Sequence, residues 1–289
     1  MRNSWILPAT LGFLAAAGAI CAVSSSRAQG MGGGQQAVPR TTSTDMQQTE
    51  LHALTDVQRQ PGLKIDPREQ NAYDAFYRVS PELADKKIQS GLAFLEKYPT
   101  SIFTEAVDAG LVSAYYERQD WKALYSTADK ALALKPDDVD VLATVGWVIP
   151  HVFDPHDENA TEQLSKAEEY EKRALQALSS MAKPAKLTDA QFAASKAEKT
   201  IQAHSALGLV YFRREDYAGS AAELQQSLQN NPHADPTDLY VLGVDLQNLN
   251  RFNDAAEAFS RCAQVAGALQ DRCKQDADEA KGKIAQPKQ

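Results

Sequence analysis

Apolar residues recur every three or four positions from about residue 66 to residue 284, which is the period of one face of an α-helix. The spacing is clearest in two stretches: Leu142, Val145, Gly146 and Ile149, and then Leu239, Leu242, Gly243 and Leu246. Pro136 and Pro232 each follow such helical stretches, and proline ends a helix because it has no amide hydrogen and clashes with the preceding turn. The pattern therefore predicts an all-α protein made of short helices.

The helical pattern itself repeats along the chain at intervals of about 34 residues. The stretch "LVSAYYERQDWKALYSTADKALALKP" (111–136) matches "LGLVYFRREDYAGSAAELQQSLQNNP" (207–232) in its leucine, its tyrosine, its aspartate–aromatic pair, its small residue and its closing proline. Each unit reads as two helices joined by a turn. The expected units are 68–101, 105–138, 139–185 with an insertion, 201–234 and 236–268, followed by a capping helix at 269–284.

Three glycines lie in the middle of predicted first helices, namely Gly146, Gly208 and Gly243. A glycine in a helix interior costs about 1 kcal/mol relative to alanine, so a stable fold needs a compensating gain. Close approach of the paired helix would provide it. We therefore expect each of these glycines at a crossing of two helices.

These features resemble the tetratricopeptide repeat family, in its exported bacterial type. The resemblance covers about residues 66–268 and implies a right-handed α-solenoid of about five helix-turn-helix units with a C-terminal capping helix. The first unit fits least well, since Asp74 and Ala75 stand where leucine and glycine are expected. The segment "GLAFLEKYPTSIFTEA" is also similar to repeats of the periplasmic envelope-assembly type.

The third and fourth units depart from the regular length. Pro150 and Pro155 are expected to open a loop over 150–162, after which the second-helix spacing resumes about nine residues late. Thr188 with Gln191 three residues on forms a capping box that starts the next helix early. If that helix runs unbroken through 188–214 it would be roughly 40 Å long and project beyond its neighbours.

The family resemblance also implies a binding surface, because its first helices line a concave groove. The positions that would face this groove are Tyr116, Glu117, Trp147, His151, Leu209, Phe212, Arg213, Tyr240, Val244 and Gln247. Exposed aromatic rings with one arginine suit an extended peptide or a partner helix. In the alternative interpretation, Trp147, Leu209, Phe212 and Tyr240 pack against one another inside the superhelix.

Motifs of enzyme chemistry are absent from the sequence, which has five histidines and neither a phosphate-binding glycine loop nor a nucleophile elbow. We therefore expect no catalytic residue and no cofactor. One cluster has metal-binding residue types, His151, Asp154, His156, Asp157 and Glu158, but such residues are also typical of a solvated loop, which is the favoured interpretation. Cys262 and Cys273 face the same helical joint and are expected as either a disulfide or two buried thiols.

Charge and the N-terminal region indicate the location of the protein. The formal net charge of the 289 residues is −8, whereas nucleic-acid binding needs clustered lysine and arginine, so nucleic acid is not an expected partner. Residues 1–28 resemble a signal peptide cleaved after Ala28, with an uncleaved membrane anchor or a lipid-modified Cys21 as alternatives. Residues 29–64 have the composition of a disordered linker.

Two hypotheses for function follow from the sequence. The first is a non-enzymatic, exported interaction module that binds a protein or peptide in the concave groove, in the periplasm or secreted. The second is a structural scaffold of an envelope or outer-membrane assembly that uses its outer faces. Any membrane association would come only through an uncleaved N-terminal segment.

Overall fold

A computed structural model describes residues 65–80, 83–184, 187–229, 231 and 234–284, and these residues form eleven α-helices with no strand. The prediction of an all-α fold is confirmed. The expected signal peptide and linker at 1–64 lie outside the described residues. The helices are α3 (Pro67–Tyr77), α4 (Ala84–Lys97), α5 (Thr104–Glu117), α6 (Trp121–Leu134), α7 (Val139–His151), α8 (Ala160–Ser180), α9 (Asp189–Arg213), α10 (Tyr217–Leu228), α11 (Pro236–Asn248), α12 (Phe252–Cys262) and α13 (Gln270–Ile284).

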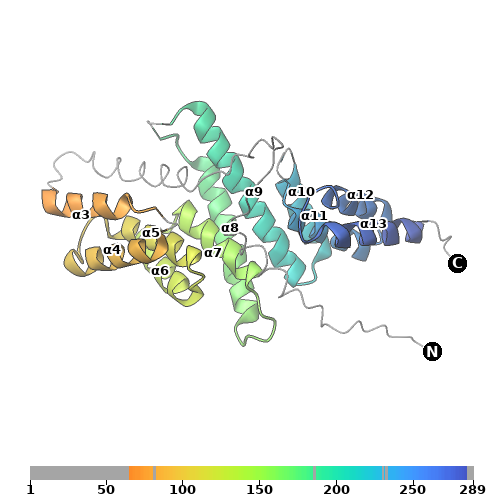
Figure 1. Ribbon diagram of the computed structural model, residues 1–289, viewed down its shortest axis with the longest axis horizontal. Coiled ribbons are helices and arrows are strands. Elements are labelled where there is room, and N and C mark those ends of the chain that lie inside the picture. The colour runs from red at the N-terminus through yellow and green to blue at the C-terminus, as the bar shows by residue number, and fades with distance from the viewer. Residues whose placement is uncertain (1–64, 81–82, 185–186, 230, 232–233, 285–289) are drawn as a thin grey trace, which may run out of the picture.

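The helices follow one another as packed pairs along an elongated molecule (Figure 1). The pairs are α3 with α4, α5 with α6, α7 with α8, α9 with α10 and α11 with α12, and α13 packs on α12 at the C-terminal end. Each predicted unit corresponds to one of these pairs, although α9 begins at Asp189, before the predicted start of its unit at 201. Because each pair mainly contacts its neighbours, the buried residues divide into three successive clusters rather than one central core.

Aspartate side chains cap the N-termini of five helices, namely α3, α6, α7, α10 and α11. Asp138 accepts hydrogen bonds from the backbone amides of Asp140 and Val141, and Asp235 accepts one from Thr237. Such caps satisfy the amides that have no partner inside the first turn of a helix. In these five helices an aspartate therefore marks where the helix begins.

A shared turn joins the two helices of the second, fourth and fifth units. Gln119, Glu215 and Asn250 occupy this turn with φ angles of 56°, 61° and 61°. A left-handed residue at this point reverses the chain within a few positions. The third unit replaces this tight turn by the longer connection 152–159.

Each glycine predicted to lie at a helix crossing does so. A Cβ atom on Gly208 would lie 2.6 Å from the Leu224 side chain, and one on Gly243 would lie 2.5 Å from the Phe259 ring. A Cβ atom on Gly146 would collide with the carboxyl group of Glu171. The paired helices thus approach as closely as the absence of a side chain permits, and this prediction is confirmed.

The two longest helices, α8 and α9, stand side by side across the middle of the molecule (Figure 1). The helix α9 is continuous over 25 residues and starts with the expected capping box of Thr188 and Gln191. The end of α8 and the start of α9 project beyond the neighbouring pairs (Figure 1).

The prediction that Pro150 opens the loop is wrong, because α7 continues through Pro150 to His151. Pro150 lies in the last turn of the helix, where its missing amide removes only one backbone hydrogen bond and few residues follow that must stay helical. The loop starts after His151, and Pro155 lies within it.

Candidate functional site

An aromatic strip connects the first helices of the second and third units. We define it as Tyr116, Trp121, Trp147 and His151. The Tyr116 ring lies 6.3 Å from the Trp121 ring and 5.9 Å from the Trp147 ring, and the His151 ring stacks on Trp147 with centroids 3.7 Å apart. All four side chains are half-buried, so each packs on a neighbour and also presents an edge to solvent.

Burial determines the charge state of His151. Desolvation lowers the pKa of its imidazole to about 4, although the backbone carbonyl of Trp147, which lies 2.6 Å from Nδ1, acts in the opposite direction. The ring is therefore neutral near pH 7. A neutral ring stacked on an indole contributes flat contact area rather than charge.

Arg213 adds a cation next to this strip. Its Nε donates to the carbonyl oxygen of Pro150 at 3.2 Å, and its guanidinium lies 5.6 Å from the centre of the Phe153 ring. Among the described residues no carboxylate pairs with it, and desolvation lowers the pKa of the guanidinium. Since arginine stays protonated even so, its remaining N–H groups can donate to an acidic partner.

Two residues expected in the groove are buried instead. Leu209 is 5% exposed and Tyr240 is 4% exposed, and both belong to the C-terminal hydrophobic cluster. The prediction of contact residues is wrong for these two, because packing between α9, α11 and α12 covers them. For them the alternative interpretation, packing within the superhelix, holds.

The other predicted groove residues differ in accessibility. Glu117 is exposed, whereas Phe212, Val244 and Gln247 are half-buried. Phe212 lies edge-to-face with Tyr217 at 6.4 Å between ring centres. The candidate binding surface is therefore smaller than predicted and centres on the C-terminal ends of α5, α7 and α9.

The acidic loop after α7 uses its carboxylates to hold its own turns. Asp154 accepts from the backbone amide of His156 at 2.9 Å, and Asp157 accepts from that of Asn159 at 2.8 Å. Over the described ranges, no group of three or more metal-binding side chains comes together. The His151 ring is stacked on Trp147 and does not join the acids of this loop.

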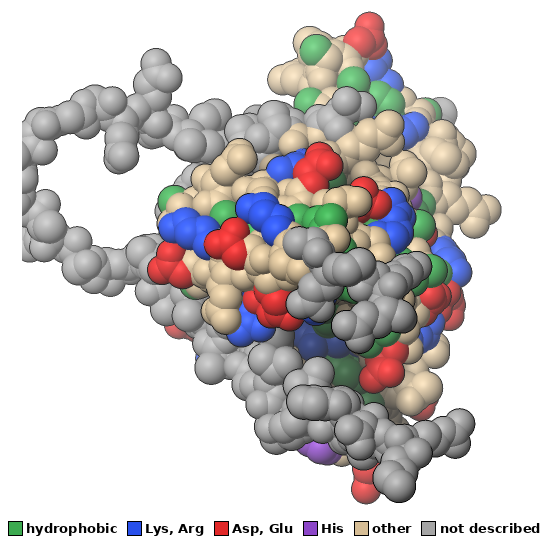
Figure 2. Space-filling model, turned by 90° about the vertical axis from the view of Figure 1, so that its right-hand side faces the viewer, with side chains coloured by type: hydrophobic (Ala, Val, Ile, Leu, Met, Phe, Trp, Pro, Cys, Tyr) green, Lys and Arg blue, Asp and Glu red, His purple; other side chains and the backbone are tan. Residues whose placement is uncertain are grey.

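A surface hollow lies elsewhere, at the N-terminal end of the array. Leu83, Ala84, Asp85, Lys86 and Arg118 line it. None of the predicted groove residues belongs to it. On the face that Figure 2 shows, acidic and basic side chains are intermixed, and neither sign gathers in one place.

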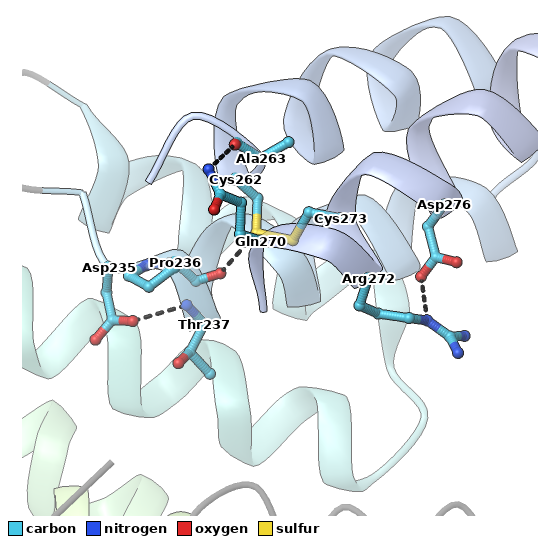
Figure 3. Close-up of a disulfide and its surroundings, with 9 residues drawn as sticks. All are labelled: Asp235, Pro236, Thr237, Cys262, Ala263, Gln270, Arg272, Cys273 and Asp276. Carbon is cyan, nitrogen blue, oxygen red and sulfur yellow. Dashed lines mark hydrogen bonds and ion pairs between the residues drawn. A yellow bond between two sulfur atoms is a disulfide. The ribbon is translucent and has the colours of Figure 1, made fainter. Parts of the chain in front are cut away.

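Cys262 and Cys273 are joined by a disulfide between α12 and α13, with a Cα–Cα distance of 5.8 Å (Figure 3). Both cysteines are buried. Gln270 supports the same joint by donating from its Nε2 to the carbonyl of Ala263 at 3.1 Å. Of the two options that the sequence leaves open, a bridge or two buried thiols, the structure has the bridge.

Sequence reasoning missed several acids buried between the helices. Asp238 accepts hydrogen bonds from Ser205 and Ser227, each at 2.7 Å, and Asp245 accepts one from Ser220 at 2.6 Å. Burial raises the pKa of Asp238 to about 6 and that of Asp245 to about 7, and the serine hydroxyls only partly offset this. These acids tie α9 and α10 to α11.

Glu171 on α8 is the most isolated of the buried acids. It is 0% exposed, and neither carboxyl oxygen has a hydrogen-bond partner. The sequence contains a signal for this position. Glu171 follows Ala167 on α8 at the same spacing at which Phe259 follows Ala255 on α12, so the two residues occupy corresponding places in their units. The insertion in the third unit hid this correspondence.

The geometry defines an α-solenoid of the tetratricopeptide type, since antiparallel helix pairs repeat and cross at small residues in the first helix. No family model matches the chain, and no curated protein matches it. Among solved structures, the chain is similar to TTC0263, a thermophilic TPR protein of Thermus thermophilus, with 14% identity, a TM-score of 0.46 and coverage of 73% of this chain and 98% of that one. It is also similar to a MamA RS-1 ArsTM double mutant, with 15% identity, a TM-score of 0.43 and coverage of 78% of this chain and 100% of that one.

None of the helices in the described part is both long enough and apolar enough to span a membrane.

Proposed function

We propose that this protein is a non-enzymatic interaction module of the cell envelope that binds a protein or peptide partner. The contact surface is the aromatic strip together with Phe212 and Arg213. One observation carries this proposal: a run of half-buried rings joins the first helices α5 and α7 and ends beside a guanidinium that no acid pairs with among the described residues. Aromatic rings and arginine are the residue types that dominate binding energy at protein interfaces.

The same surface suggests the chemistry of the partner. Planar rings offer a large contact area at a low cost in side-chain entropy, and Arg213 offers N–H donors to a carboxylate. A partner segment that carries an apolar or aromatic side chain next to an acidic one would satisfy both. The net charge of −8 makes such an isolated cation more distinctive.

Export of the protein is the second part of the proposal. The disulfide between Cys262 and Cys273 supports it, since structural disulfides form and persist in oxidising compartments. The N-terminal sequence supports it independently. A mass spectrum of the protein purified from its cells should match a chain that begins at Gln29, whereas an intact chain beginning at Met1 would contradict cleavage.

Site-specific photo-crosslinking in intact cells tests the binding surface. A crosslinking side chain at position 212 should capture a defined partner, while one at position 225 on α10, where Gln225 is exposed, serves as the control. The combined substitution Tyr116→Ala, Phe212→Ala and Arg213→Ala should abolish the capture. The combined change Lys122→Ala, Lys130→Ala and Gln225→Ala alters only exposed side chains of the second helices and should leave it intact.

The reverse result would favour the scaffold hypothesis. If position 225 captures the partner and position 212 does not, the outer faces make the contact. The projecting end of α8 and α9 is the feature that supports this second function, because it extends away from the rest of the array (Figure 1). Circular dichroism of each combined variant shows whether a loss of capture comes from a loss of fold.

A further inference from the structure

The crossing of α7 and α8 contains an ionisable group where the other crossings contain a hydrocarbon. Gly208 faces Leu224 and Gly243 faces Phe259, whereas Gly146 faces the carboxyl group of Glu171. A leucine or phenylalanine gains free energy when it is buried at such a point. A carboxyl group gains none, and its charged form requires hydrogen bonds that this site does not supply.

The surroundings of Glu171 offer it no compensation. Both carboxyl oxygens are buried without a partner. The turn of α7 that it touches also lacks a regular backbone hydrogen bond, because Pro150 has no amide hydrogen to give to the Gly146 carbonyl. The unpartnered carboxyl group and the missing backbone hydrogen bond therefore lie next to each other in the third unit.

The charged groups of the helices around Glu171 are directed elsewhere. Lys199 pairs with Asp140, and Glu168 receives hydrogen bonds from Lys172 and Arg214. Several other charged or titratable groups on the flanking helices also interact with groups other than Glu171: Asp129 with Lys166, Lys130 with Asp108, His151 with the Trp147 carbonyl, Tyr211 with Glu168, His204 with Glu223 and Arg213 with the Pro150 carbonyl. The Tyr125 hydroxyl on α6 is buried without a hydrogen-bond partner, and burial raises its pKa to about 12, so it is neutral between pH 5 and pH 8. Burial alone raises the pKa of Glu171 well above its ordinary value, and no neighbouring charge contributes to that change.

We propose that the crossing of α7 and α8 is a proton-controlled hinge, which stays closed while Glu171 is neutral and opens locally when Glu171 ionises. Local opening is compatible with this architecture, because each unit of an α-solenoid depends mainly on its immediate neighbours. The remaining links between α7 and α9, the Lys199–Asp140 pair and the bond from Arg213 to Pro150, do not pass through α8.

The direction of the pH effect follows from the raised pKa of a buried acid. The closed state binds the Glu171 proton more tightly than the open state, so closure is favoured most at pH values below the ordinary pKa of about 4.5. This advantage declines as the pH rises toward the higher pKa of the closed state. The ratio of closed to open crossing then falls by up to about tenfold per pH unit.

The hinge also lies next to the candidate binding surface, because both include residues of α7. Trp147 directly follows Gly146 in α7, and His151 lies one turn further along the same helix. Opening of the crossing therefore changes the support under the aromatic strip. The hinge itself does not depend on the proposed function, since its test uses the isolated protein.

Hydrogen exchange of the purified full chain at about pH 5 and about pH 8, normalised to intrinsic exchange rates, tests the hinge. In the wild type we expect the protection of α7 and α8 amides to fall between the two conditions. Glu171→Gln should remove most of this fall, because glutamine keeps the shape and cannot ionise. Glu171→Leu, which copies the residue at the corresponding place in α10, gives the same test if the glutamine variant fails to fold.

Asp245→Asn is the matched control, since it neutralises another buried acid at the contact of α10 and α11. It should leave the pH dependence of α7 and α8 unchanged. An equal pH dependence of α7 and α8 in the wild type and in both Glu171 variants would overturn the hinge. A change spread equally over all helices would also overturn it, because the opening would then be global.

Discussion

The crossings of α7 with α8 and of α11 with α12 are built from the same backbone approach but filled with different chemistry. Gly243 leaves room for the ring of Phe259, which is 0% exposed, and Gly146 leaves room for the carboxyl group of Glu171, which is equally buried. The first contact contains no titratable group. The second is favoured most while Glu171 is protonated, because burial raises the pKa of its carboxyl group. The repeat geometry therefore accommodates a side chain that is less favourable there than a hydrocarbon.

The position of each crossing in the array adds to the contrast. The α11–α12 pair is followed by α13, which the Cys262–Cys273 disulfide joins to it. The α7–α8 pair lies in the middle, where a longer loop replaces the tight turn of the second, fourth and fifth units. One end of the solenoid is therefore covalently closed, and its centre contains the least satisfied contact.

The largest effect is expected at the hydrophobic crossing, from Phe259→Ala. Removing a fully buried phenylalanine should lower the free energy of unfolding by about 4 kcal/mol, measured by urea denaturation. Gly243→Ala alone should cost about 1–3 kcal/mol, since its Cβ atom would meet the Phe259 ring.

In the Phe259→Ala background, Gly243→Ala should instead be neutral or stabilise by up to about 1 kcal/mol, because alanine favours helix more than glycine. The double variant thus measures the contact directly. Strictly additive effects would contradict the close-approach explanation of the mid-helix glycines.

The next effect concerns the covalent closure of the C-terminal end. The combined substitution Cys262→Ala and Cys273→Ala should lower the free energy of unfolding by about 2–3 kcal/mol, since the bridge closes a loop with a sequence separation of 11 residues. Reductant should destabilise the wild type by a similar amount and leave the double variant unaffected. If reductant has no effect on the wild type, α13 is held by packing alone.

A smaller effect of opposite sign is expected at the acidic crossing. Glu171→Leu should raise the free energy of unfolding by about 2 kcal/mol at about pH 8, because it removes a buried group without hydrogen-bond partners. The folded-state pKa of Glu171 is raised, so the wild type gains stability as the pH falls toward 4.5. The difference between the two proteins should therefore shrink at low pH, and a constant difference would contradict the assigned cause.

The smallest effect is expected at an exposed ion pair between two helices that also pack through their buried faces. Arg118 on the C-terminal side of α5 pairs with Asp85 on α4, and the two side chains are 50% and 85% exposed. Asp85→Asn should change the free energy of unfolding by less than about 0.5 kcal/mol, because solvent screens exposed ion pairs. A loss comparable to that of Phe259→Ala would show that the crossings are not what holds the units together.

The order of helices was predictable because it depends on local chemistry. The spacing of apolar residues acts within one or two turns of chain, and the glycines lie at the crossings where the sequence indicated. Even the start of α9 was readable, since a capping box needs only Thr188 and Gln191.

The binding surface was less predictable because exposure depends on more than one helix. Trp147, His151, Phe212 and Arg213 keep solvent-facing edges, whereas Leu209 and Tyr240 occupy equivalent positions and are buried. The repeat register assigns all of them to the same face. How much of that face stays open depends on the angle and distance at which the next pair packs.

The sequence by itself determined the class of fold, the number of helix pairs and the places where helices must touch, because periodicity and residue size act over short distances. Only the tertiary structure decided which of those contacts is an unpaired acid, which groove residues are covered, and that Cys262 meets Cys273. Whether a side chain is buried, and which groups it contacts, depends on the helices that pack around it. For Glu171, whose carboxyl group would be ordinary on a surface, the packed position alone makes ionisation costly.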